Sequence, residues 1–166
     1  MGKLLSPRLV VRPMSMADLE DFREIVFDPR VHSTLIVAPS VYLKVLEECA
    51  DGPERGEAAH QFSATATLVS ECQFVAGGLL YQNNLSYFVH PEMWRRGIGL
   101  EFVAMFLGEI ARLPGLTEVT ACVLRNNVAS RLILERVGFR FTGLAYHKRE
   151  NEMTRLAVLN YRYSLG

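Results

Sequence analysis

The segment HPEMWRRGIGLEF, residues 90–102, joins a short apolar strand to a long apolar helix through a glycine-containing turn. Gly97 and Gly99 stand where the helix is expected to begin. The first backbone N–H groups of a helix have no partner inside it, and the helix dipole favours an anion at that end. The segment therefore predicts a phosphate-binding turn, with an ordinary chain reversal as the alternative interpretation of its glycines.

The turn matches neither of the two common nucleotide-binding motifs. The dinucleotide pattern GxGxxG needs a further glycine that this segment lacks. A P-loop needs a Lys-Ser or Lys-Thr pair after its last glycine, whereas Leu100 and Glu101 follow here. The turn thus predicts a phosphorylated ligand other than those that the two motifs bind.

Outward from this turn, hydrophobic periodicity predicts one α/β domain over residues 1–166. Strands are expected over residues 9–12, 62–68, 74–81, 85–89, 118–123, 139–146 and 154–164. Helices are expected over residues 19–27, 40–49, 99–113 and 127–137, and loops over 51–59 and 148–152. The strand–helix–strand unit over residues 85–123 should form a right-handed parallel crossover, so the sheet should be mixed.

The charge of the chain is balanced, with 18 basic and 18 acidic residues. This balance argues against a dedicated nucleic-acid-binding or membrane-surface protein. No apolar run approaches about 20 residues and no cationic segment leads a signal-length apolar stretch, so a cytoplasmic location is expected. Three widely spaced cysteines, Cys49, Cys72 and Cys122, form no CxxC pair, which predicts buried thiols in a reducing compartment and no metal site.

A second segment narrows the choice of ligand. Asn127-Val128-Ala129-Ser130 begins a predicted helix that ends at Arg136-Val137-Gly138-Phe139. The order strand, W-x-x-G-x-G, helix, strand, N-x-x-S and closing G-F resembles the GNAT superfamily of acyl-CoA-dependent N-acyltransferases. The opening RLVVRPMSMADLEDF is similar to the first strand and helix of that family. The segment PEMWRRGIG looks most like the corresponding sequences of the branch that contains ribosomal-protein N-terminal acetyltransferases.

This resemblance implies a single GNAT-type domain that uses acetyl-CoA as acyl donor and needs no metal. The implied fold is a mixed, largely antiparallel central sheet of about six or seven strands flanked by helices. A parallel, splayed strand pair in that sheet gives CoA its slot. Two phosphates can use fixed backbone donors, and the amide-rich pantetheine arm can extend a sheet edge, so the physical chemistry agrees.

The resemblance also implies which residues hold the donor. Backbone amides in the turn should hold the CoA pyrophosphate, namely those of Arg95, Arg96, Gly97, Ile98, Gly99 and Leu100. The backbone of Phe88 and Val89 should pair with the pantetheine arm, and Asn127 should lie beside it. Alternatively, Arg95 and Arg96 are solvated surface charges and Asn127 only caps its helix, although capping and CoA contact are compatible. Trp94 is expected to serve in packing rather than in substrate contact.

The catalytic acid is the least settled part of the site. Many superfamily members protonate the leaving sulfur with a tyrosine four residues before the G-F glycine, but Leu134 occupies that position here. Ser130 is close to one helical turn after Asn127 and could face the thioester, and some relatives are thought to use a serine there. We therefore take Ser130 as the candidate catalytic residue. The equal alternative is a helix-surface serine that bonds its own backbone.

The general base and the acceptor stay open. Asn84 stands where many related sequences carry a carboxylate, so the candidates are Glu71, Ser86, Tyr87, His32 and His60, or water that relays the proton. The acceptor is expected to be a primary amine, on a protein N-terminus or a small molecule. Acidic residues that could attract it fall in the 51–59 loop. The alternatives are a non-catalytic acyl-CoA-binding module and a transferase of a different acyl group, and the chain could form a homodimer.

Overall fold

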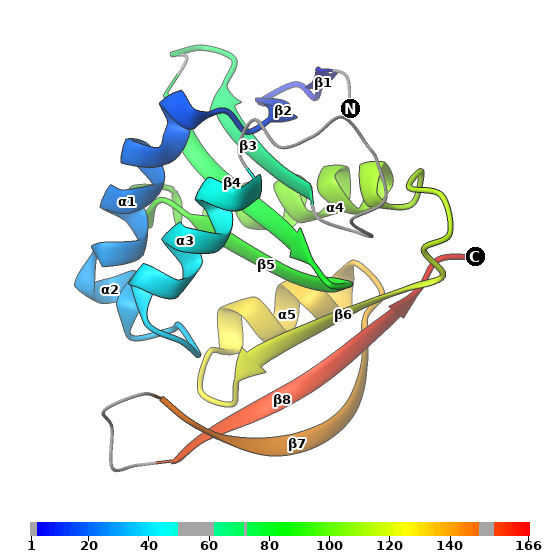
Figure 1. The fold of residues 1–166 in the computed structure, drawn as a ribbon. Helices are drawn as coiled ribbons and strands as arrows, with labels where there is room; N and C mark the ends of the chain where they lie inside the picture. The colour runs from blue at the N-terminus through cyan, green and yellow to red at the C-terminus, as the bar shows by residue number, and fades with distance from the viewer. Residues whose placement is uncertain (1–2, 50–61, 72, 150–154) are drawn as a thin grey trace.

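A computed structural model of the chain describes residues 3–49, 62–71, 73–149 and 155–166. One eight-stranded sheet forms its centre, in the order β1-β2-β3-β4-β5-β6-β8-β7 (Figure 1). The strands are β1 (Leu4–Leu5), β2 (Leu9–Pro13), β3 (Phe62–Leu68), β4 (Phe74–Tyr81), β5 (Asn84–Val89), β6 (Glu118–Leu124), β7 (Arg140–Lys148) and β8 (Arg155–Ser164). This is the mixed, mostly antiparallel sheet that the resemblance implies, with eight strands instead of about six or seven because the two-residue β1 is added at one edge.

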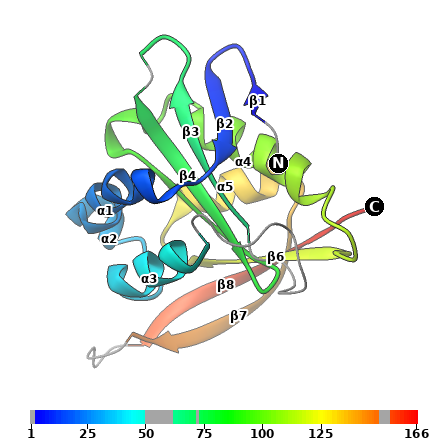
Figure 2. The same ribbon diagram turned by 45° about the horizontal axis from the view of Figure 1, so that its top comes forward.

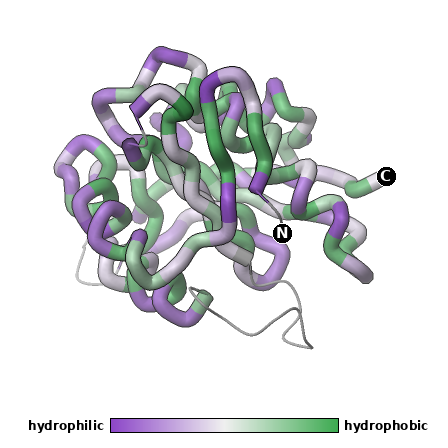
Figure 3. Tube along the Cα trace, turned by 90° about the horizontal axis from the view of Figure 1, so that it is seen from above, coloured by the Kyte–Doolittle hydropathy of each residue, from purple (hydrophilic) through white to green (hydrophobic). Residues whose placement is uncertain are grey.

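Helices cover both faces of the sheet (Figures 1 and 2). One face carries α1 (Leu19–Phe27), α2 (Pro29–His32) and α3 (Pro39–Cys49). The other face carries α4 (Ile98–Ile110) and α5 (Val128–Arg136). In Figure 3 hydrophobic and hydrophilic segments alternate along the helices, as expected for helices that each bury one side against a sheet.

Each face of the sheet has its own hydrophobic core. Phe102 and Phe106 of α4 stack on each other, with 5.5 Å between ring centroids, and pack with residues of β2 to β6. On the opposite face Phe22 of α1 contacts Phe74 and Phe88 edge to face. Gly77 lies beneath Phe22, and a Cβ atom there would come within 2.0 Å of the ring, so the close approach of α1 to the sheet requires glycine.

The only parallel pair in the order of strands given above, β5 with β6, separates soon after it begins. The recorded register joins Asn84 with Thr120 and Leu85 with Ala121 and goes no further. The Asn84 side-chain amide also donates to Thr120 Oγ1 at 3.2 Å, which fastens the strands where they still touch. Beyond Leu85 the two strands diverge, so backbone and side chains between them face a common gap.

Most predicted elements are confirmed, and the differences have local causes. The helix expected over 99–113 ends at Ile110, because residues 111–112 form a turn before Pro114. Burial of the thiols is a wrong prediction for Cys122, which is exposed on β6 where that strand leaves β5. The 51–59 loop, Cys72 and residues 150–152 of the predicted hairpin tip lie outside the described residues.

Candidate functional site

The turn before α4 adopts a backbone conformation that suits an anion site. Gly97 is the N-cap of α4 with φ of 78°, and Arg95 also has a positive φ, of 62°. The first hydrogen bond recorded for α4 runs from Glu101 N to Gly97 O at 3.1 Å. The amides of Ile98, Gly99 and Leu100 precede it, so they have no partner inside the helix and point out of its N-terminal end.

Two further contacts hold this turn in place. Gly99 is buried, and a Cβ atom there would lie 3.0 Å from Ile133 and 3.2 Å from Val89. A larger residue would therefore push α5 or β5 away. On the outer side, Arg8 donates from Nη1 to the carbonyl oxygen of Arg96 at 2.7 Å and pairs with Glu101.

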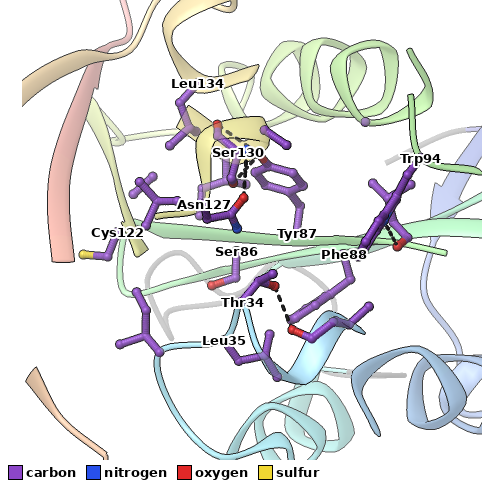
Figure 4. Close-up of a pocket in the computed structure, with 18 of the residues that line it drawn as sticks. Thr34, Leu35, Ser86, Tyr87, Phe88, Trp94, Cys122, Asn127, Ser130 and Leu134 are labelled. Carbon is purple, nitrogen blue, oxygen red and sulfur yellow. Dashed lines mark hydrogen bonds between the residues drawn. The ribbon is translucent and has the colours of Figure 1, made fainter. Parts of the chain in front are cut away.

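A cavity of about 350 Å³ opens next to the turn, in the gap between β5 and β6 (Figure 4). Six of the predicted site residues line it: Phe88, Val89, Arg95, Gly99, Asn127 and Ser130. The other four, Arg96, Gly97, Ile98 and Leu100, are in the turn itself but do not line the cavity. The cavity thus runs from the helix N-terminus along the end of β5 to the start of α5.

Strand β5 presents alternate side chains to two opposite sides of this cavity. In Figure 4 Tyr87 extends toward α5, whereas Ser86 and Phe88 extend toward the connection between α2 and α3. Tyr87 packs at the α4 and α5 core and Phe88 belongs to the α1 to α3 core. The alternation follows from strand geometry, in which successive side chains point to opposite faces.

On the α5 side, Asn127, Ser130 and Tyr87 form a connected set. Asn127 caps α5, and its Oδ1 accepts from the Ser130 backbone N–H at 3.1 Å. The hydroxyl oxygens of Ser130 and Tyr87 lie 2.6 Å apart, and the Tyr87 hydroxyl is also 3.3 Å from the Ser130 carbonyl oxygen. Burial raises the pKa of Tyr87 to about 12, so its phenol stays protonated at neutral pH.

Leu134 and Asn84 occupy the two positions where many relatives carry proton-transfer residues, and here each has a structural role. Leu134 lines the cavity and is buried in the core, so no polar atom occupies that position. Asn84 lies at the start of β5, where its amide bonds Thr120 Oγ1. A neutral amide cannot take a proton at neutral pH, so Asn84 offers no base.

The wall opposite α5 is mainly apolar. Val31, Leu35, Ile36 and Tyr42 line it from α2, α3 and the connection between them, and Phe88 contributes from β5. Burial raises the pKa of the Tyr42 phenol, against the opposing effect of hydrogen bonds from the Ile36 backbone and the Ser86 hydroxyl. Nη2 of Arg149 donates to the carbonyl oxygen of Leu35, which ties the end of β7 to this wall.

The structure brings only some of the candidate bases to the cavity. Ser86 and Tyr87 line it, whereas His32 and Glu71 do not, and His60 lies outside the described residues. Trp94, expected to serve in packing rather than in substrate contact, lies at the cavity and outside the buried cores. It is 41% exposed, lines the cavity and donates from Nε1 to the Val89 carbonyl oxygen at 2.9 Å.

Sequence reasoning missed several contributors to this site. Thr34, Tyr42 and Cys122 line the cavity, and Arg8 holds the turn. Tyr42 falls on a helix predicted from its periodicity, and nothing in that pattern shows that the ring reaches β5. Within the described ranges, no cluster of three or more His, Cys, Asp or Glu side chains could hold a metal ion. No helix in those ranges is long and apolar enough to cross a membrane.

Comparison with protein families gives one match over most of the chain. Residues 8–140 match a family model described as "Acetyltransferase (GNAT) domain". The match includes the turn before α4, the gap between β5 and β6, and α5. A search of curated protein sequences found no significant match.

Solved structures with the same fold have little sequence in common with this chain. A spermidine N-acetyltransferase from Vibrio cholerae, in complex with CoA and spermine, has a TM-score of 0.78 at 12% identity, covering 96% of this chain and 97% of its own. A ribosomal-protein-S5-alanine acetyltransferase from Vibrio fischeri has a TM-score of 0.74 at 13% identity, covering 99% and 97%. A Salmonella typhimurium protein solved with its cofactor acetyl-CoA has a TM-score of 0.71 at 16% identity, covering 95% and 94%. These likenesses establish the fold alone.

Proposed function

Because the chain belongs to the GNAT acetyltransferase family, we propose that it transfers an acetyl group from acetyl-CoA to a primary amine. The observation that carries the proposal is the position of the α4 N-terminus beside the gap between β5 and β6. A pyrophosphate fits the outward amides of the helix end, and a pantetheine arm fits a strand edge that its neighbour has left. Two of the structural neighbours contain CoA or acetyl-CoA, which supports the same donor here.

In the proposed donor site, the turn before α4 binds the donor through its backbone amides, and the edge of β5 binds it through backbone hydrogen bonds. Amides of Arg95 to Leu100 would hold the pyrophosphate, with the left-handed Gly97 shaping the turn and Gly99 letting the start of α4 pack against α5 and β5. Phe88 and Val89 would pair with the pantetheine arm, although the Val89 carbonyl already accepts from Trp94. Asn127 would lie along that arm while it caps α5.

In the proposed reaction, the neutral amine attacks the thioester carbonyl directly and forms a tetrahedral intermediate. The intermediate collapses with the electron pair of the C–S bond moving to sulfur. Ser130 lines the cavity on the α5 side and would give its proton to that sulfur. The amine would enter along the apolar wall opposite, and water would carry away the proton that the amine loses.

The test has a binding stage and a turnover stage. Isothermal titration should show acetyl-CoA binding, and thiol release from acetyl-CoA should appear with at least one member of a panel of amines. The panel should contain peptides with free N-termini, amino acids, polyamines and amino sugars. Absence of binding at millimolar acetyl-CoA would reject the proposed donor.

A second candidate function is a non-catalytic acyl-CoA-binding module. Leu134 and Asn84 favour it, because the first is apolar and the second is engaged with Thr120, so both usual proton-transfer positions lack their chemistry. Binding of acetyl-CoA without turnover over the whole panel would support this second function. Mass spectrometry of CoA esters that co-purify with the chain would reveal a donor with a different acyl group.

A further inference from the structure

We propose that Tyr87 positions Ser130 and supplies it with a proton, so that the two hydroxyls act as one relay toward the departing sulfur. The inference rests on the proposed acetyl transfer. It gives Tyr87 of β5 the role of the phenol that α5 lacks, since Leu134 stands at that position. The two hydroxyl oxygens lie 2.6 Å apart, and both residues line the cavity. Figure 4 shows the Tyr87 side chain directed at Ser130 from β5.

The hydrogen-bond geometry permits the direction that the relay needs, since either hydroxyl can donate in the 2.6 Å contact. The Tyr87 hydroxyl is 3.3 Å from the Ser130 carbonyl oxygen, which can only accept, and 2.6 Å from Ser130 Oγ. The single phenolic proton therefore faces two acceptor atoms of the same residue. When Tyr87 donates, the Ser130 proton is left to point into the cavity.

The backbone of Ser130, unlike its hydroxyl, is held independently of Tyr87. Its backbone N–H is bound by Asn127 Oδ1 at 3.1 Å at the start of α5. Tyr87 comes from a different element, β5, which is itself paired along its length with β4. The two hydroxyls thus meet because α5 docks against β5, and neither residue needs the other to keep its backbone in place.

A phenol suits the second position in the relay for chemical reasons. With a pKa of about 12, Tyr87 stays protonated at neutral pH, and as a phenol it is still a stronger acid than the serine hydroxyl. An alkoxide on Ser130 would recover a proton from it readily. Leu134, at the position where many GNAT members carry the tyrosine, is 1% exposed and offers no proton.

The proton transfers balance. When the C–S bond breaks, its electron pair goes to sulfur, and the Ser130 Oγ proton passes to that sulfur. The Tyr87 proton passes to Ser130 Oγ, and the phenolate then takes a proton from water. The amine has lost one proton to water, so the sum is one amide and one thiol formed from one amine and one thioester.

The relay is tested with Tyr87→Phe, Ser130→Ala and the double variant, each assayed by thiol release and by acetyl-CoA titration. Removing either hydroxyl should lower kcat about 100-fold, within the usual range for general acid catalysis, with little change in acetyl-CoA affinity. The double variant should lose about as much as either single one, because both changes break the same relay. In H₂O–D₂O mixtures, kcat should vary non-linearly for the wild type and linearly for Tyr87→Phe.

Tyr161→Phe is the matched control. Tyr161 is 2% exposed and donates to Glu135 Oε1 at 2.9 Å, so the change also removes a buried phenolic hydrogen bond, but Tyr161 does not line the cavity. Its kcat should stay within twofold of the wild type. The relay is wrong if Tyr87→Phe also stays within twofold, or if the double variant loses the product of the two single losses. A wild-type chain that binds acetyl-CoA but turns over no amine would instead reject the proposed function, and the relay with it.

Discussion

The guanidinium of Arg8 donates a 2.7 Å hydrogen bond to the carbonyl oxygen of Arg96, although 88 positions separate the two residues in the chain. Arg8 directly precedes β2 and Arg96 lies in the turn before α4. The same guanidinium pairs with Glu101 in the first turn of α4, whose other carboxylate oxygen accepts from Ser6. The turn that we propose to bind pyrophosphate is therefore held from outside by the start of the chain.

Replacing Arg8 with alanine should weaken acetyl-CoA binding several-fold while kcat at saturating donor stays close to that of the wild type. The change removes the donor to Arg96 O and leaves the turn to reorganise on binding. Titration and the KM for acetyl-CoA measure the effect. Arg162→Ala removes an arginine of similar exposure, paired with Glu118 at 3.4 Å, and should change neither quantity. An unchanged Kd in Arg8→Ala would contradict the anchoring role.

Replacing Gly97 with alanine should weaken acetyl-CoA binding by about tenfold. The φ of 78° costs an L-residue roughly 1–2 kcal/mol, so the turn would leave its binding conformation. Crowding is not the cause, because the nearest atom to a Cβ there, Arg8 Nη2, is 3.4 Å away.

Gly108→Ala is the control for this change. Gly108 is exposed on α4 with no atom within 4 Å of a Cβ, so alanine there should stabilise the helix by about 0.5–1 kcal/mol without affecting binding. Thermal unfolding and titration separate the two outcomes. Equal binding by both glycine variants would show that the left-handed conformation at Gly97 does not matter for the donor.

The pH dependence of kcat should show only a rising limb between about pH 7 and pH 10. The rate increases as the amine loses its proton. A phenol acting as proton donor is lost only as the pH passes its own pKa, and burial raises the pKa of Tyr87 to about 12. The kcat profile with saturating substrates checks this. A descending limb centred below pH 10 would identify a different acid.

Acceptor amines that carry an apolar group beside the amine should have a lower KM than acceptors without one. The wall of Val31, Leu35, Ile36 and Tyr42 can bury such a group, and full burial of a leucine-sized side chain is worth about 1.5–3 kcal/mol. Leucine amide should therefore show at least about a fivefold lower KM than glycine amide. The KM for acetyl-CoA, measured with both acceptors, is the internal control. Equal KM values for the two amides would show that this wall is not the acceptor site.

Local patterns in the sequence were sufficient for most of the fold. Strands Phe62–Leu68 and Phe74–Tyr81 match their predicted bounds because each is a continuous apolar or alternating run between turn residues. Gly138 follows the end of α5 with a φ of 104°, as expected for a glycine that terminates a helix. The sequence pattern places the end of α4 too late, because apolar residues still occur in the turn that follows Ile110.

The site was harder to predict, because its key contacts join distant parts of the chain. The motif residues of the turn and of α5 could be named from the sequence, but the partner of Ser130 could not. Tyr87 is 43 positions from Ser130, and its hydroxyl reaches that serine only because α5 packs against β5. A tyrosine in a strand is ordinarily a packing residue, and Tyr87 does pack on the core as well as bond Ser130.

The alternation of β5 also bears on how such an enzyme can change its substrate. Ser86 and Tyr87 are neighbours in sequence, yet one faces the wall formed by residues 31–42 and the other faces α5. Under the proposed function, the choice of amine and the departure of the thiol are thus encoded in separate segments. Mutations in the connection between α2 and α3 can retune the choice of amine while the machinery on α5 is inherited intact. A mutant library restricted to residues 31–42 should accordingly be sufficient to select variants that accept a different amine.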